Sequence, residues 1–376
     1  MLYLDHAAGG PVRREVLEAM ASFLTGRFGN PSSVHGVGED ASSALEDART
    51  RVARVLGFRS GDIVFTSGGT EANNLAIAGI ALGARGRMPG RVVTTAIEHE
   101  SVLAVCDHLV RLHDYAVDVL PVDGTGRVDP GAVAAAIRPD TAVVSIGFAN
   151  NEIGTVQDVA AIVDAAGEVP VHLDAVQAAG WLPLAATGAA AMSIAGHKIG
   201  AAQGIGVLAV RGRLPLEPVI HGGGQERGRR SGTQNVAGAV GLAVALELAE
   251  RERDDAVRRA TSARDAFVDR VVHSVPGAAL TGHPTRRLPG HASFVFAGTS
   301  GEAVLLELER RGVVTSSGSA CAAGRTEASH VLLAVGLDED ATRTAVRFTF
   351  DRTAAPDPVS LGTAVADAVA AVRSGA

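Results

Sequence analysis

One residue type is almost missing from this chain of 376 residues, and its single occurrence is the first pointer to chemistry. Among the 34 basic residues, Lys198 is the one lysine, and all the others are arginines. Arginine keeps its guanidinium protonated and cannot condense with an aldehyde, whereas a lysine amine with a lowered pKa can form a Schiff base. A leftover surface lysine is the plain alternative. The neighbours favour the reactive role, since the run MSIAGHKIG at residues 192–200 predicts a short strand that leads into glycine, histidine and this lysine.

A second segment has the composition of a phosphate-binding turn, with the sequence TSGGTEAN at residues 66–73. An apolar strand pattern precedes it and a helix is predicted to begin near Thr70. Free backbone N–H groups, the helix dipole and the Thr70 hydroxyl would converge on an anion, while Gly68 and Gly69 would let the backbone approach it closely. Helix capping by Ser67 or Thr70 is the plain alternative. Neither a Walker loop nor a GxGxxG pattern occurs, so an ordinary nucleotide site is not indicated.

A third segment, VHLDAVQ at residues 171–177, ends an apolar strand pattern in a carboxylate. It puts Asp174 at the carboxyl end of the predicted strand and Gln177 just beyond, where open α/β folds bind ligands. A carboxylate there could pair with the protonated ring nitrogen of pyridoxal 5'-phosphate, although a helix N-cap accounts for Asp174 alone equally well. A phosphate cradle, a strand-end carboxylate and a lysine that can form an imine together predict a pyridoxal phosphate site.

The elements that must position these residues alternate between two patterns over about residues 15–210. Amphipathic helical patterns separate short apolar, β-branched runs, and this alternation predicts βαβ units with a mainly parallel sheet. The strand-like runs lie at residues 62–66, 91–95, 142–146, 171–174 and 206–210.

A long helical pattern over about residues 236–272 becomes more charged after Glu247, which suits an element that bridges two domains. We therefore expect a large cofactor-binding domain over residues 15–253, and a smaller α+β domain from residues 1–14 and 254–376. The smaller domain is predicted from two strand patterns and two helical patterns, near residues 293–296, 346–350, 301–311 and from about residue 358.

Composition narrows the class of protein. The chain is 47% hydrophobic and 20% charged, with a formal net charge of -7 and scattered arginines. No apolar run reaches about eighteen residues and no secretory leader is evident, so we expect a soluble, cytoplasmic protein without direct nucleic-acid or membrane partners. The two cysteines, Cys106 and Cys321, form no CxxC pair, so no metal site and no disulfide framework is predicted. Cys106 shares a helical face with Val102 and Leu109, which is typical of a buried residue.

Ordered motifs over almost the whole chain resemble the cysteine desulfurases of the class V aminotransferase group, which are fold-type I pyridoxal phosphate enzymes. The motifs are YLDHAA at residues 3–8, FGNPSS at 28–33, FTSGGTE at 65–71, EH at 98–99, NNEIG at 150–154, DAVQ at 174–177, GHK at 196–198, HGGGQER at 221–227, RSGT at 230–233 and SSGSAC at 316–321. The resemblance implies an α/β fold, with a mainly parallel seven-stranded sheet in the large domain.

The resemblance also implies roles for individual residues. Those that carry the cofactor or hold its ring are Lys198, Asp174, Gln177 and His99. Those that hold its phosphate are Gly69, Thr70, His197 and, from the other subunit of a homodimer, Thr233. Asn151 borders the cofactor and, with Arg347, would hold the substrate carboxylate. Taken alone, His99 would also suit a core histidine, and Arg347 a surface salt bridge.

Cys321 separates the expected reaction from other chemistry on this fold. It lies in a loop of small residues with little to pack, from which its thiolate could take the sulfur of bound L-cysteine as a persulfide and leave alanine. The resemblance matches Cys321 to the family's persulfide cysteine. Its SSGSAC form is similar to the branch that delivers sulfur to acceptor proteins, such as iron–sulfur scaffolds, thiolation proteins, DNA-sulfur-modifying proteins or sulfur carriers.

Two other functions fit parts of the pattern. The same cofactor site could serve an aminotransferase, an epimerase or a carbon–sulfur lyase that forms no persulfide, but Cys321 argues against these. A non-catalytic sulfur-relay scaffold would keep the fold with a vestigial site, but the intact Lys198, Asp174 and His99 argue against it.

The chain departs from the family pattern near the predicted site. Gly9 and Gly10 stand where paired threonines are usual, and Ala195 replaces a serine, which removes one phosphate hydrogen bond worth about 1 kcal/mol or somewhat more. AAQ at residues 201–203 replaces Gly-Pro-Lys, and FTFDR at residues 348–352 replaces Ser-Leu-Gly-Arg. These departures bear on cofactor affinity and substrate choice.

Overall fold

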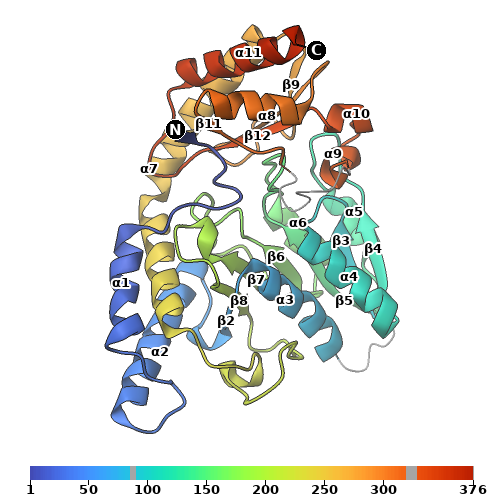
Figure 1. Ribbon diagram of the computed structural model, residues 1–376. Coiled ribbons are helices and arrows are strands. Elements are labelled where there is room, and N and C mark those ends of the chain that lie inside the picture. The colour runs from blue at the N-terminus through green and yellow to red at the C-terminus, as the bar shows by residue number, and fades with distance from the viewer. Residues whose placement is uncertain (85–89, 319–327, 376) are drawn as a thin grey trace.

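A computed structural model describes residues 1–84, 90–318 and 328–375, so Cys321 lies outside the described residues (Figure 1). Within those residues, the central sheet has seven strands in the order β2-β8-β7-β6-β5-β3-β4. Their bounds are β2 (Ile63–Thr66), β3 (Arg91–Thr95), β4 (Ala116–Leu120), β5 (Thr141–Gly147), β6 (Val171–Asp174), β7 (Ala191–Ala195) and β8 (Gly206–Val210). The strand β8 pairs antiparallel with β2 and β7, while the other pairs are parallel. The predicted mainly parallel, seven-stranded sheet is confirmed.

Helices cover both faces of this sheet, which accounts for the almost continuous apolar runs in its inner strands. Successive residues alternate between the faces: Val64 and Leu208 pack with α3 and α4, whereas Phe65 and Val207 pack with α2 and the first half of α7. Cys106 on α4 is buried on the first of these faces, as predicted. The helices that flank the sheet are α1 (Arg14–Thr25), α2 (Gly36–Leu56), α3 (Gly69–Gly83), α4 (Glu100–His113), α5 (Pro130–Ala136), α6 (Val159–Ala166) and α7 (Val236–Ser274).

A second layer lies at the far end of α7. A three-stranded antiparallel sheet in the order β12-β10-β9 packs there with α8 and α11 in the part of the chain that the structure describes. Figure 1 shows α7 running from beside α1 and α2 to α11. The elements of this layer are β9 (Ala278–Leu280), β10 (His291–Phe296), α8 (Gly301–Arg310), β11 (Val313–Val314), α9 (His330–Ala334), α10 (Glu339–Thr342), β12 (Ala345–Thr349) and α11 (Pro358–Ser374).

The amino terminus packs with this C-terminal layer. The strand β1 (Leu2–Tyr3) pairs parallel with β11, and Leu4 is buried in one cluster with Phe267, Phe294 and Phe348. The helix α7 runs unbroken through residue 253, so the domain boundary placed there stays a prediction. Among the described residues, no helix combines the length and the apolar character that crossing a membrane requires.

Candidate functional site

The predicted site residues follow different strands but lie at one edge of the central sheet. Gly69 follows β2, His99 follows β3, Asn151 follows β5, Asp174 ends β6 and Lys198 follows β7. Because the carboxyl ends of parallel strands meet at the same edge, these positions converge. A pocket of about 450 Å³ lies there. Its lining includes the predicted residues Gly69, Thr70, His99, Asn151, Asp174, Gln177, His197, Lys198 and Arg347.

Two predicted residues are not placed in this pocket. Thr233 is exposed on the segment before α7 and does not line the pocket of its own chain. Cys321 lies outside the described residues. The described residues on either side of that omitted stretch, Gly318 and Ala328, both line the pocket.

Asp174 is buried and held by two donors. Its Oδ2 accepts a hydrogen bond from Nδ2 of Asn73 at 2.7 Å, and its Oδ1 accepts one from the backbone N–H of Val176 at 3.0 Å. No described helix begins at Asp174, so this residue is not a helix N-cap. Asn73 was not predicted as a site residue, although it ends the TSGGTEAN motif; its amide oxygen has no partner among the described residues.

His99 sits at the start of α4 and is tied to the same carboxylate. Its Nδ1 accepts the backbone N–H of Ser101 at 3.1 Å, so the neutral ring carries its proton on Nε2. The same Nδ1 lies 2.9 Å from the Ser101 hydroxyl, which accepts from Asn73 at 3.0 Å. Half-buried and lining the pocket, His99 is not a core histidine. Ser101 and Asn73 therefore fix the imidazole and the carboxylate relative to each other.

The first turn of α3 has the features expected of an anion site. Gly68 is the N-cap and no side chain caps the helix, so capping by Ser67 or Thr70 is not the reason for this motif. Uncapped first-turn N–H groups and the helix dipole suit a phosphate. A Cβ on Gly206 of β8 would lie 2.6 Å from the Gly68 backbone, so the turn passes this strand only because position 206 is glycine.

His197 and Ala195 line the same pocket as this helix start. Burial, with a smaller effect of the nearby Lys198 charge, lowers the pKa of His197 to about 4, so its imidazole is neutral near pH 7 and can donate one hydrogen bond. Ala195 lines the pocket, and its Cβ would lie 3.3 Å from a Cβ on Gly69. The family's missing serine hydroxyl would thus have stood beside the α3 turn.

Lys198 follows β7 in the short helix η2 (Gly196–Lys198) and faces the N-terminal segment. Its Nζ donates to the carbonyl oxygens of Ala7 and Ala8, at 2.5 and 2.8 Å. The side-chain amide of Gln177 donates to the same Ala7 carbonyl at 3.0 Å. The YLDHAA motif therefore supplies backbone acceptors to a lysine that lines the pocket.

Arg347 on β12 carries a buried ion pair rather than a surface one. One of its terminal nitrogens lies 2.6 Å from Oδ1 of Asp5, and the other donates to the carbonyl oxygens of Asn151 and Gly318, both at 2.9 Å. The Nε of Arg347 has no partner among the described residues. The Asn151 carbonyl also accepts a hydrogen bond from the protonated Nε2 of His291 at 3.1 Å. Burial is the main cause that lowers the pKa of His291.

Glu98 is a pocket residue to which the sequence patterns assigned no role. Its carboxyl is buried and accepts from the Thr95 hydroxyl at 2.6 Å and from the Gly147 N–H at 2.7 Å. Burial, with the charge of Asp174 adding to it, raises the pKa of Glu98 to about 8. The EH motif at residues 98–99 was the one feature of the sequence that could have pointed to Glu98 as a site residue.

The donor set tests whether pyridoxal phosphate fits. An uncapped helix start would suit the phosphate of that cofactor, a buried carboxylate its ring nitrogen, and the lysine that follows the neighbouring strand β7 its aldehyde. The residues fit the group. The fold and the pocket thus define an α/β protein that brings an uncapped helix start, a buried carboxylate and a lysine together at one sheet edge, the arrangement that a pyridoxal phosphate enzyme requires.

Within that class, the chain belongs to the Aminotransferase class-V family, whose sequence model matches residues 2–360. A cysteine desulfurase IscS from Dictyoglomus turgidum is 42% identical over 354 residues, which are 93% of this chain and 89% of the relative. A solved NifS-like protein superposes with a TM-score of 0.90 at 33% identity, over 98% of this chain and 99% of the other. A structure described as SspA in complex with cysteine gives a TM-score of 0.81 at 33% identity, over 93% and 99% of the two chains. These neighbours confirm the predicted fold class.

Proposed function

We propose that this protein is a pyridoxal 5'-phosphate-dependent cysteine desulfurase that converts L-cysteine to L-alanine and receives the sulfur on Cys321. A single observation carries the proposal. One pocket gathers Lys198, Asp174 and Arg347, and both Gly318 and Ala328, which flank the stretch that contains Cys321, line the same pocket. Its relatives named cysteine desulfurase, and the related SspA structure that contains cysteine, support the substrate.

The cofactor would be held at three points. The α3 turn at Gly69 and Thr70, with His197, would bind the phosphate; Asp174 would keep the ring nitrogen protonated; and the Lys198 amine would bind the aldehyde. When bound, the cofactor supplies an electron sink for the amino acid attached to it. The hydrogen bond from Asn73 would hold the Asp174 carboxylate in place for the ring nitrogen.

The substrate would be oriented by Arg347 and Asn151. Arg347 lines the pocket and is charge-paired with Asp5, and its guanidinium would offer a positive charge to the substrate carboxylate. The Nζ of Lys198 can then accept the α-proton, since this amine lies in the same pocket. The Cys321 thiolate would take the sulfur: a sulfur–sulfur bond forms, the carbon–sulfur bond breaks, and alanine leaves with the electron pair and a proton.

The assembly and the sulfur acceptor are part of this proposal. Thr233 lies exposed rather than in the pocket of its own chain, as expected if it serves the second subunit of a homodimer. Phe28 and Val34, in or near the FGNPSS motif, are 71% and 94% exposed, which suits a covered subunit interface. The acceptor would be an iron–sulfur scaffold, a thiolation protein or a sulfur carrier. The absence of a disulfide framework in the sequence suits a reducing, cytoplasmic setting.

The test is product analysis of the protein reconstituted with pyridoxal phosphate. Incubation with L-cysteine and a thiol reductant should give sulfide and alanine in equal amounts, and Lys198→Ala should give neither. Pyruvate or racemised cysteine as the main product would instead identify a lyase or an epimerase. A protein that binds no cofactor would point to the sulfur-relay scaffold.

A further inference from the structure

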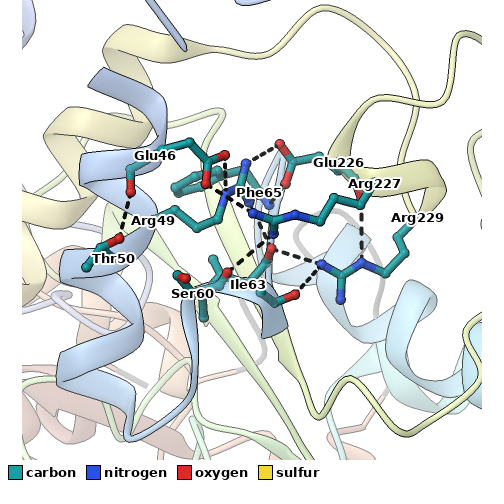
Figure 2. Close-up of polar contacts among 10 residues, drawn as sticks. Glu46, Arg49, Thr50, Ser60, Ile63, Phe65, Glu226, Arg227 and Arg229 are labelled. Atoms are coloured by element: carbon teal, nitrogen blue, oxygen red, sulfur yellow. Dashed lines mark hydrogen bonds and ion pairs between the residues drawn. The ribbon is translucent and has the colours of Figure 1, made fainter. Parts of the chain in front are cut away.

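The segment that carries Thr233 is anchored by a buried ion pair. This glycine-rich segment, residues 221–233, includes the short helix η3 (Glu226–Gly228) and lies between β8 and α7. The Glu226 carboxylate and the Arg49 guanidinium of α2 form two parallel contacts, at 2.7 and 2.8 Å. Figure 2 shows the pair, whose residues are 4% and 2% exposed. Nothing in the catalytic scheme uses either residue.

The ion pair also hydrogen-bonds to the backbone of β2. The backbone N–H of Phe65 donates to Glu226 at 2.9 Å, and Arg49 donates to the carbonyl of Ile63 at 2.8 Å (Figure 2). The strand β2 is an edge of the sheet that pairs with β8, so these backbone groups lie on its open side. The two side chains therefore take the place of a neighbouring strand, immediately before the turn that leads to α3.

The backbone at the anchor has a conformation that requires a local constraint. Glu226 and Arg227 have φ angles of 49° and 59°, a left-handed conformation that side chains other than glycine rarely adopt. Two such residues in succession persist only where the surroundings over-determine them. A buried, fully hydrogen-bonded ion pair supplies that constraint, because releasing either partner would leave an uncompensated charge.

A second ion pair ties the same segment to the other side of the anion site. Arg230 contacts Glu71 in the first turn of α3, with nitrogen–oxygen distances of 2.8 and 3.2 Å. Glu71 in turn accepts the backbone N–H of Ser67 at 2.8 Å. The segment thus contacts the phosphate-binding turn through β2 before it and through α3 after it.

We propose that Arg49 and Glu226 are positioning residues: their ion pair latches the 221–233 segment onto the phosphate-binding turn and so sets both that turn and Thr233. The phosphate affinity of the site and the order of the segment are then linked through residues that do not line the pocket. This inference rests on the proposed function for its ligand, the cofactor phosphate, but its structural half does not depend on catalysis.

The test uses the three arginines of the segment as built-in trypsin sites. In full-length Glu226→Gln, trypsin cleavage after Arg227, Arg229 or Arg230 should be at least tenfold faster than in wild type. Pyridoxal 5'-phosphate should bind about tenfold more weakly by absorbance titration, whereas pyridoxal, which lacks the phosphate, should bind as in wild type. The matched control is Arg51→Met, which removes the neighbouring α2 to α7 ion pair with Glu247 and should leave both measurements unchanged.

Each outcome decides the proposal. Cleavage and phosphate-dependent affinity within twofold of the control would overturn the latch, as would equal weakening of pyridoxal and pyridoxal phosphate. If Glu226→Gln does not fold, the partly exposed Glu71→Gln decides in its place, with at least threefold faster cleavage expected and unchanged cleavage overturning the proposal. Faster cleavage in a protein that makes no alanine would support the latch and count against the proposed function alone.

Discussion

The side-chain nitrogen of Asn73 lies 2.7 Å from Oδ2 of Asp174, although 101 residues separate them in the chain. The helix α3, whose first turn is the candidate anion site, therefore also fixes the carboxylate at the end of β6. The same nitrogen reaches Ser101, which contacts the imidazole of His99. The side-chain amide of Asn73 thus connects α3 with the Asp174 carboxylate and, through Ser101, with the His99 imidazole.

We predict that Asn73→Ala weakens pyridoxal phosphate binding about 10- to 100-fold. A hydrogen bond to a charged group contributes about 1.5–3 kcal/mol, and each 1.4 kcal/mol is about tenfold in affinity. Absorbance titration of the apoprotein measures this loss. Asn74→Ala is the control, since Asn74 donates to the Thr70 carbonyl at 2.9 Å rather than to Asp174. Equal losses in both variants would show that the contact with Asp174 is unimportant.

The raised pKa of Glu98 predicts that the stability of the fold depends on pH. Its pKa in the folded protein is raised from 4.5 to about 8, so the fold favours the protonated carboxyl. Its contribution is fully present below about pH 4.5 and is lost as the pH rises through about 8. Between pH 5 and 9 the free energy of unfolding should therefore fall less in Glu98→Gln, which cannot ionise, than in wild type. Urea unfolding at several pH values measures this difference, and parallel curves would contradict it.

The sequence predicted the strands best where they are buried on both faces, because a short, near-continuous apolar run between turn residues is typical of such a strand. The strand β4 escaped prediction: it is an edge strand, partly exposed, with Asp118 in its middle paired to Arg91 of β3. Hydrophobic periodicity cannot indicate such a strand, because its charged residue Asp118 is paired with an arginine on another strand, and the local sequence does not show that pairing.

The same limit applies to the site. Residue types at strand ends indicated Asp174 and Lys198, because those positions converge in any parallel sheet. Asn73 and Ser101 act through contacts between the inner faces of α3 and α4, and Arg49 meets Glu226 across 177 residues. No local pattern encodes such pairs, so the residues that hold the site residues in place could be found only in the structure.

Lys198→Arg should abolish covalent attachment of the cofactor while keeping the fold. Arginine can still donate to the Ala7 and Ala8 carbonyls that Lys198 contacts, but it cannot form an imine. Borohydride reduction of the wild-type protein with pyridoxal phosphate should label the peptide that contains Lys198, and the variant should retain no label there. Equal labelling of the amino terminus in both proteins would show that attachment is not specific.

Subunits with different defects should complement each other if Thr233 serves the second subunit. A dimer of Lys198→Ala and Thr233→Ala chains keeps one intact site, so mixing should restore activity to roughly half per heterodimer. Mixing Lys198→Ala with Asp174→Ala is the control, because the structure puts both residues in the pocket of one chain. No restoration in the first mixture, or equal restoration in both, would contradict a shared site.

The two cysteines should differ sharply in reactivity. Burial, with a smaller effect of the Glu98 charge, raises the pKa of the Cys106 thiol to about 12, and this side chain is 3% exposed. Cys106 should therefore hold little thiolate near neutral pH, and we expect it not to accept sulfur.

Cys321→Ser should accordingly lower alanine formation from L-cysteine roughly 100-fold or more, since a serine hydroxyl stays protonated and forms no persulfide. Pyridoxal phosphate binding should stay near the wild-type level, because every predicted cofactor contact comes from other residues. Cys106→Ser is the matched control and should keep its sulfur transfer. After cysteine addition, mass spectrometry of wild type should find a reductant-sensitive gain of one sulfur on the Cys321 peptide. The same gain on the Cys106 peptide, or undiminished alanine formation by Cys321→Ser without reductant, would show that another group accepts the sulfur.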